Sequence, residues 1–418
     1  MSTTLTTPAR DVTSRPQPWP PAIWALLTVT LVARAGGFSY PFLGYHLKHL
    51  NYTTVAVGQA LALFGVGWLV GQVITGWAAD RFGRRRTLVA AMTVAAVSLP
   101  VLAQARAYLA ICAGALVAGV VYDAARPVVS ACIADLVHND AQRAAVNGWR
   151  HGGVNIGAAI TGAVGGVLAG PLGFEFLFWL NAAACAACAV IAHRFLAPDP
   201  VLLPRVAVSR AAHREAATDV RLWLLWLAST AALTCAAGMY TALPLLMEQD
   251  GLSADAYGLT QLANAVAVLA LTPLLTPWLS RRCGRSRPML GMLAVSALLL
   301  GAGMAMAGLV DTTWGYSLAV AAAVPGEIVF FLAASDVLNK ISPDRARGLY
   351  AGIWGSSLAA AVIVAPLLAA ASLTAGGEHL TALTTLTAGA LGAAVGLLLI
   401  PLTRPRIPDD DRLEPAHS

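Results

Sequence analysis

Four charged side chains stand inside apolar stretches of this chain, and they are the residues best placed to do chemistry. Asp123 and Arg126 lie three positions apart in "GVVYDAARPVVSAC" (119–132), Arg34 lies in "VTLVARAGGFSY" (29–40), and Glu327 lies in "AVPGEIVFFL" (323–332). Desolvation favours a protonated carboxyl group and a neighbouring guanidinium opposes protonation, so a carboxylate held between the two can load and release a proton. These residues therefore predict proton transfer within an apolar environment.

The composition indicates that this environment is a lipid bilayer. Only 11% of the 418 residues are charged, against roughly 25% in an ordinary soluble domain. Two soluble domains would leave long uncharged stretches without a polar face, so we exclude that alternative. A window of about 20 residues predicts twelve membrane spans, each of which must be a helix because lipid offers no partner for the backbone. They are placed near 21–45, 54–78, 87–104, 107–135, 145–170, 172–196, 221–247, 255–279, 288–309, 313–338, 347–374 and 379–401.

The spans divide into two related halves. "GWAADRFGRRRTLV" (76–89) aligns with "PWLSRRCGRSRPML" (277–290) at an offset of 201 residues. The predicted fold is therefore an all-α polytopic membrane protein with twelve transmembrane helices in two pseudo-symmetric six-helix bundles. The expected division is an N-terminal tail (1–20), a first bundle (21–197), a linker (198–220), a second bundle (221–401) and a C-terminal tail (402–418).

The basic residues predict the orientation. Lys48 and Arg106 fall on one side of the predicted spans, Arg34 and Arg126 fall within spans, and all other lysines and arginines fall on the opposite side. The positive-inside rule then puts both termini in the cytoplasm. The formal charge of +6 thus reflects topology and not nucleic-acid binding. We expect a multi-pass protein of the bacterial plasma membrane, without a signal peptide in residues 1–20.

The loop "GWAADRFGRRR" (76–86) resembles motif A of the major facilitator superfamily. "ARAGGFSYPFLGYHL" (33–47), "ARPVVSACIADLV" (125–137) and "WRHGGVNIGAAITGAVGGVLA" (149–169) resemble the drug:proton antiporter branch of that superfamily. The resemblance covers essentially the whole chain. It implies an alternating-access transporter.

The resemblance also implies a latch at the cytoplasmic side. In similar antiporters the motif-A aspartate engages a motif arginine, an acid on span four and the start of span eleven. The turn near 347–350 is the expected partner from span eleven, and Arg281 replaces the aspartate in the second half, where no equivalent latch is expected. The candidate latch residues are Gly76, Asp80, Arg81, Gly83, Arg84 and Asp135.

Span five carries the glycines of the antiporter pattern, with Thr161-Gly162 in place of the Gly-Pro pair of the family. A general role in close helix packing is the alternative interpretation, because small residues let helices approach. The glycines are Gly148, Gly157, Gly162, Gly165 and Gly166.

The four mid-span charges are expected to share a polar cavity. Even the lenient insertion scale gives a cost of about 2.5–3.5 kcal/mol for one charge at the bilayer centre, and in the similar family spans one, four and ten line a central cavity. Simple neutralisation of Asp123 by Arg126 remains the alternative. Glu327 is the expected principal proton carrier; it corresponds to Arg126 at the 201-residue offset, so the two could face each other. The full candidate set is Glu327, Asp123, Arg126, Arg34, Arg150, Asn155, Tyr40, Tyr122 and Tyr240.

The predicted function is proton-coupled export of small amphipathic, drug-like molecules. A proton-coupled uptake permease of the same fold is the first alternative, and a non-transporting membrane receptor is the second. No phosphate-binding Gly-Lys loop occurs in the sequence, so the proton gradient and not ATP is the expected energy source. We expect no enzymatic activity, no metal and no cofactor. The expected partners are lipid, protons and a small-molecule substrate, with a monomeric chain.

Overall fold

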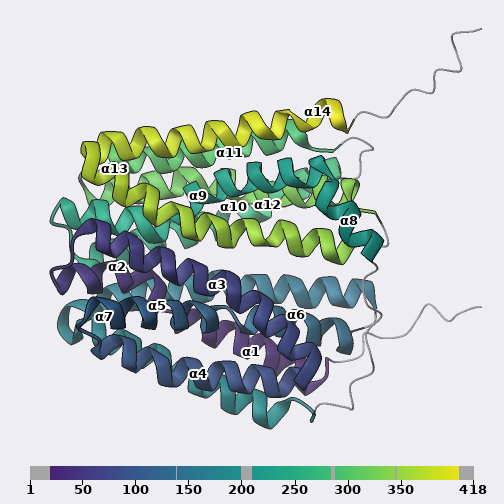
Figure 1. Ribbon diagram of the computed structural model, residues 1–418, viewed down its shortest axis with the longest axis horizontal. Coiled ribbons are helices and arrows are strands. Elements are labelled where there is room, and N and C mark those ends of the chain that lie inside the picture. Colours follow the sequence, from purple (N-terminus) through teal and green to yellow (C-terminus); the bar gives the residue numbers. More distant parts are fainter. Residues whose placement is uncertain (1–18, 138, 199–209, 284–287, 344–345, 404–418) are drawn as a thin grey trace, which may run out of the picture.

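The computed structural model describes residues 19–137, 139–198, 210–283, 288–343 and 346–403, and within these ranges all regular secondary structure is helical (Figure 1). This confirms the predicted all-α membrane fold. The first seven helices are α1 (Pro21–Ala35), α2 (Ser39–His49), α3 (Thr54–Phe82), α4 (Arg84–Gln104), α5 (Tyr108–Tyr122), α6 (Ala125–Leu136) and α7 (Asp140–Phe195). The others are α8 (Arg210–Thr218), α9 (Val220–Gln249), α10 (Ala254–Cys283), α11 (Leu290–Ala305), η1 (Met306–Leu309), α12 (Thr313–Ile341), α13 (Arg347–Leu397) and α14 (Leu399–Leu402).

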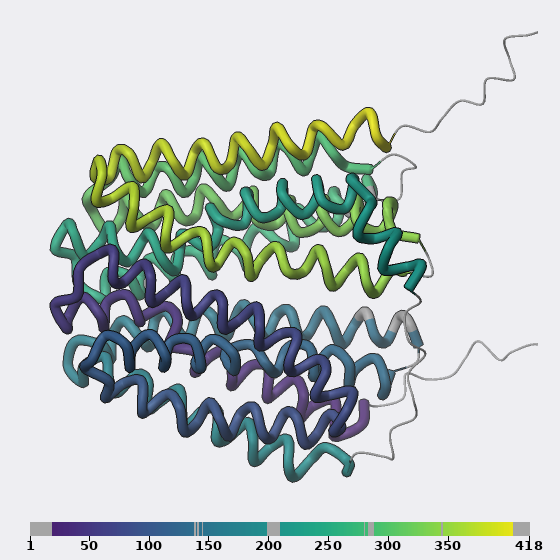
Figure 2. Tube along the Cα trace, in the orientation of Figure 1, coloured from purple at the N-terminus to yellow at the C-terminus, as the bar shows by residue number. Residues whose placement is uncertain are grey.

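Two of the helices are long enough to cross a bilayer twice. Ten apolar segments among the described residues have the length of a span, and those within α7 and α13–α14 contain 51 and 56 residues. At about 1.5 Å per residue each would be more than twice the ~30 Å thickness of the hydrocarbon core. Each turns back at a glycine with non-helical geometry, Gly173 in α7 and Gly377 in α13 (Figure 2). The structure is therefore consistent with the twelve predicted crossings.

Spans one and four, which the sequence predicted as continuous helices, are each broken in the middle. The first consists of α1 and α2, separated at Gly36–Phe38, and the fourth consists of α5 and α6, separated at Asp123 and Ala124. The structure confirms the predicted spans as segments of spanning length, Pro21–His49 and Tyr108–Leu136, but the break within each was not predicted. Charged residues stand at or near both positions, but a window that averages over 20 residues hides so local a drop in hydropathy and could not detect the breaks.

The two ends of the molecule differ. We call the end where α1 begins and α8 lies the linker end, and the opposite end, where α7 and α13 turn back, the hairpin end (Figure 1). One hydrophobic cluster lies mainly among α1–α7 and another mainly among α9–α13, and each includes residues of the other bundle where the two pack together. The two bundles meet along α3 and α13, α7 and α10, and α2 and α9.

Glycines show where the two bundles touch. A Cβ atom on Gly58 of α3 would lie 2.5 Å from the Cβ of Ala370 in α13, and one on Gly166 of α7 would lie 2.8 Å from the Cα of Gly258 in α10. Lys48 and Glu248 form an ion pair of 3.4 Å between the bundles at the same end. In the linker-end halves of α3, α7 and α13, a Cβ atom would meet nothing within 4 Å at Gly76, Gly148, Gly152, Gly348, Gly352 and Gly355. The bundles are thus closed at the hairpin end and separated at the linker end.

We predict that Gly166→Val destabilises this conformation, because the added side chain must push α7 away from the backbone of α10. Overpacking of this kind costs about 1–3 kcal/mol. The matched control is Gly152→Val on the same helix, where the added Cβ meets open space. Thermal unfolding in detergent should show a clearly lower midpoint for Gly166→Val. Equal midpoints for the two variants would contradict the close contact.

Candidate functional site

The break between α1 and α2 is held by side chains of α7. The hydroxyl of Thr161 donates hydrogen bonds to the carbonyl oxygens of Arg34 and Ala35, the second at 2.9 Å. The backbone N–H of Ser39 donates to Oδ1 of Asn181 at 3.1 Å. Irregular backbone within a membrane must find such partners inside the protein. The break therefore places Arg34 at a fixed position in the last turn of α1.

The break between α5 and α6 carries a second pair of charges. Nε of Arg126 donates to Oδ2 of Asp123 at 3.0 Å, and the carboxamide of Gln72 donates to the carbonyl oxygen of Asp123 at 3.3 Å. The side chain of Asp123 is 21% exposed and that of Arg126 is 45% exposed. In this conformation Asp123 and Arg126 neutralise each other.

Arg34 lies beneath a cluster of aromatic rings. Its Nη1 donates to the hydroxyl of Tyr122 at 3.2 Å, and its Nε has no hydrogen-bond partner. Tyr40 is buried, and its hydroxyl has no hydrogen-bond partner either. The centroid of its ring lies 5.0–6.2 Å from the ring centroids of its aromatic neighbours. Those neighbours are Phe64, Trp68, Tyr122 and Tyr240. Tyr240 comes from α9, so the cluster joins the two bundles on the hairpin-end side of the site.

Glu327 extends from α12 toward the same place. It is half-buried, and the guanidinium that interacts with it electrostatically is that of Arg34 in the other bundle. Tyr240 also interacts with Glu327. The sequence suggested that Glu327 and Arg126 could face each other; in the structure Arg126 pairs with Asp123 on its own span. Within the first bundle, Asp123 pairs with Arg126 and also interacts electrostatically with Arg34, whereas the charge of Arg34 acts on Glu327 between the bundles.

Two further candidates lie on α7. Nη1 of Arg150 donates to the hydroxyl of Ser130 on α6 at 2.8 Å, and Arg150 interacts electrostatically with Arg126 and Asp123. Asn155 is half-buried between Arg150 and Thr161.

Sequence reasoning did not assign a bonding role to four polar residues that contribute to these contacts, although it noted Thr161 as a departure from the family pattern. Each stands alone within an apolar stretch, and that isolation is the signal that could have identified it. They are Gln72, Ser130, Thr161 and Asn181.

The predicted latch residues form contacts within the first bundle. Arg84 pairs with Asp135, and its Nη1 lies 3.7 Å from Oδ1 of Asp80. Gly83 adopts a φ of 99° in the turn between α3 and α4, a conformation that favours glycine. Arg81 is exposed, and Gly76 faces open space. These contacts fit a linker end at which the two bundles are apart.

The corresponding contacts of the second bundle use other residues. The hydroxyl of Tyr350, at the start of α13, donates to Asp219 at 2.9 Å. Burial raises the pKa of Asp219, but hydrogen bonds from Arg221 and Tyr350 outweigh it and leave the pKa below its ordinary value. Asp336, which corresponds to Asp135 at the 201-residue offset, accepts a hydrogen bond from the N–H of Met289 at 3.0 Å and pairs with Lys340 at 2.8 Å. The second bundle thus keeps an acid on its fourth span that contacts the start of its third span, and this acid pairs with a lysine in place of an arginine.

Four of the five span-five glycines are sites of close approach. A Cβ on Gly157 would lie 2.7 Å from the Cβ of Arg34. In the same way, an added Cβ would be too close to Gln261 at Gly162, to Phe42 at Gly165 and to Gly258 at Gly166. Gly148 faces open space. The packing interpretation therefore accounts for the glycines from Gly157 onward in this structure.

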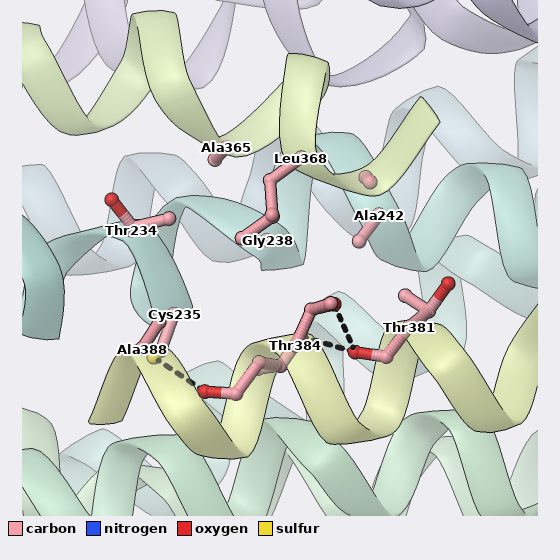
Figure 3. A pocket seen from close by; sticks show the side chains of 11 residues that line it. Thr234, Cys235, Gly238, Ala242, Ala365, Leu368, Thr381, Thr384 and Ala388 are labelled. Carbon is pink, nitrogen blue, oxygen red and sulfur yellow. Dashed lines mark hydrogen bonds between the residues drawn. The ribbon is translucent and has the colours of Figure 1, made fainter. Parts of the chain in front are cut away.

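A separate void lies inside the second bundle, between α9 and α13 (Figure 3). Its volume is about 10 Å³, which is room for about one water molecule. Cys235 donates to the carbonyl oxygen of Thr385 at 3.3 Å beside it. The void is too small for a solute and does not include the charged residues.

Comparisons with known proteins agree on the fold. The family model described as Major Facilitator Superfamily matches residues 25–340 and 251–418. Among solved structures, the chain is similar to a POT family transporter in complex with a thioalcohol conjugated peptide, at 14% identity and a TM-score of 0.76, over 92% of this chain and 96% of that chain. It is also similar to an auto inhibited POT family peptide transporter, at 14% identity and a TM-score of 0.72, over 95% of this chain and 99% of that chain. No curated protein matches the chain. These findings do not support the drug:proton antiporter branch that the sequence suggested.

We predict that Thr161→Val destabilises the protein, because the carbonyl oxygen of Ala35 loses the hydroxyl that binds it at the helix break, while that of Arg34 keeps the backbone N–H of Gly37. An unpaired buried polar group costs about 1–3 kcal/mol. The matched control is Thr374→Val, whose hydroxyl bonds only within its own helix and is exposed. Unfolding in detergent should give a larger loss for Thr161→Val, and equal losses would sink the assigned role.

Proposed function

The chain belongs to the Major Facilitator Superfamily, and from this premise we propose that it is a proton-coupled uptake permease for small solutes that carry both an acidic and a basic group. The observation that carries the proposal is the placement of a guanidinium, Arg34 on α1, and a carboxyl group, Glu327 on α12, on different bundles, where the charge of Arg34 acts on Glu327. Rocking of the bundles therefore changes their separation. The solved structures with this fold, including a POT family transporter in complex with 5-aminolevulinic acid, support the same class of solute.

The charges of the site give the coupling a physical basis. When Glu327 is ionised, it competes with any anionic solute group for Arg34. Protonation of Glu327 removes this competition and leaves a positive guanidinium, to which a solute carboxylate can bind in its place. Asp123 meanwhile stays paired with Arg126, so the site gains only one positive charge. Solute and proton then bind together, and an inward proton gradient drives uptake.

Export of amphipathic molecules in exchange for protons is the second candidate. The aromatic cluster around Tyr40 favours it, because aromatic rings bind apolar solutes. In that case solute and proton would compete for Glu327 and move in opposite directions. A receptor that does not transport would show no flux in either direction.

Orientation is part of the proposal. The positive-inside pattern places the linker end in the cytoplasm, so that the described conformation is open to the inside. The proposed bundles keep the boundaries 21–197 and 221–401, in a monomer.

The orientation predicts which introduced cysteines react with an impermeant reagent in intact cells. In a chain without its six native cysteines, Gln249→Cys at the hairpin end should be labelled and Ala217→Cys on α8 should not. Both side chains are exposed, so access to the reagent and not burial decides the result. Labelling of Ala217→Cys alone would reverse the orientation.

We predict that Glu327→Gln abolishes uptake driven by a pH gradient while solute exchange across the membrane continues. A neutral amide mimics the protonated acid but cannot release a proton. The measurement is dipeptide uptake and counterflow in proteoliposomes, and Glu215→Gln on α8, outside the site, is the control. Gradient-driven uptake by Glu327→Gln at the wild-type level would show that another group carries the proton.

A further inference from the structure

Two carboxamide side chains on α10 have polar atoms without partners inside the protein. Gln261 is only 5% exposed, and its Nε2 has no hydrogen-bond partner. Asn264, one turn further along the same helix, is half-buried, and its Oδ1 has no partner. The side of α10 that carries Leu259, Leu262 and Val266 is the exposed one. The two carboxamides therefore face the interior.

The packing of α10 against α7 places these carboxamides beside the charged site. Gly162 presses against Gln261, and one turn toward the hairpin end Gly166 presses against Gly258. The residue before Gly162 is Thr161, whose hydroxyl binds the carbonyl oxygen of Arg34. Gln261 thus lies next to the break in span one that holds the guanidinium.

The same antiparallel register can be followed toward the linker end. It brings Asn264 opposite residues 158–159 of α7, both alanine, and the half-buried Asn155 lies one turn beyond. Here the helices begin to part, because nearer the linker end an added Cβ would meet nothing within 4 Å at Gly152 or Gly148. Asn264 is therefore at the point where the interface opens toward the linker end.

The chemistry of the two unpartnered atoms is complementary. Nε2 of Gln261 is a donor and Oδ1 of Asn264 is an acceptor, and they lie three residues apart on one helix face. Leaving such groups unpaired is costly, so a buried site of this kind fits a ligand that satisfies both. An amide group offers a carbonyl acceptor and an N–H donor side by side.

We propose that Gln261 and Asn264 recognise an amide bond of the solute, with Gln261 donating to its carbonyl oxygen and Asn264 accepting from its N–H. This rests on the proposed uptake function and specifies its substrate class as short peptides. Arg34 binds the carboxylate of the solute while Glu327 is protonated, and the carboxamide pair distinguishes an amide from an ester of the same shape. An ester lacks the N–H and leaves Asn264 without a donor.

The test compares alanyl-alanine with its ester analogue, alanyl-lactate, by calorimetric binding to the purified full-length protein. The wild type should bind the amide about tenfold more tightly, the ratio that one lost hydrogen bond produces. Asn264→Leu should reduce the ratio to less than about twofold, and Gln261→Met should weaken both ligands about equally. Gln249→Met, an exposed position at the end of α9, is the matched control and should keep the wild-type ratio.

The outcomes separate this inference from the proposed function. Equal binding of the two ligands by the wild type, or no binding of the dipeptide, would overturn amide recognition. An unchanged ratio in Asn264→Leu would also overturn it. An amide preference that disappears in Asn264→Leu supports the inference, even if proteoliposomes then show no proton-driven uptake and the uptake proposal fails. Proton-driven uptake without an amide preference supports the uptake proposal and rejects this inference.

Discussion

The electrostatic interaction of Arg34 with Glu327 is the feature on which the account depends. It is the interaction that links the mid-span charges of one bundle to those of the other. Charges at this depth are costly, so they persist only where they balance one another. Because the partners belong to different bundles, any rocking of the bundles changes their separation. The energy of the proton can in this way be linked to the movement of the helices.

The surrounding structure keeps Arg34 in position while leaving the interaction free to change. The break in span one is fixed by Thr161 and Asn181, both from α7. Close glycine contacts seal the hairpin end, whereas the glycines of the linker end face open space. Alternating access requires an interface between the bundles that is closed at one end at a time. It also requires that the guanidinium of Arg34 keep its position within its own bundle. The carboxamides of α10 lie where these two features meet.

The sequence predicted the coarse architecture well. Hydropathy alone is enough to find segments of spanning length, and the glycine pairs near 173 and 376 divide the two longest ones. It also predicted that Asp123 and Arg126 would be close, because residues three apart share a helix face. The breaks in spans one and four could not be read from hydropathy, since backbone geometry depends on partners such as Thr161 that are distant in sequence. For the same reason the partner of Glu327 was unclear until the two bundles were placed together.

The most direct test of the central claim is the number of protons taken up when solute binds. It can be measured by calorimetry of dipeptide binding at neutral pH in buffers of different ionisation enthalpy. The account predicts uptake of close to one proton per solute by the wild type and none by Glu327→Gln, with Asp123→Asn retaining proton uptake if it binds. Equal proton uptake by the wild type and Glu327→Gln, or none by either, would contradict it.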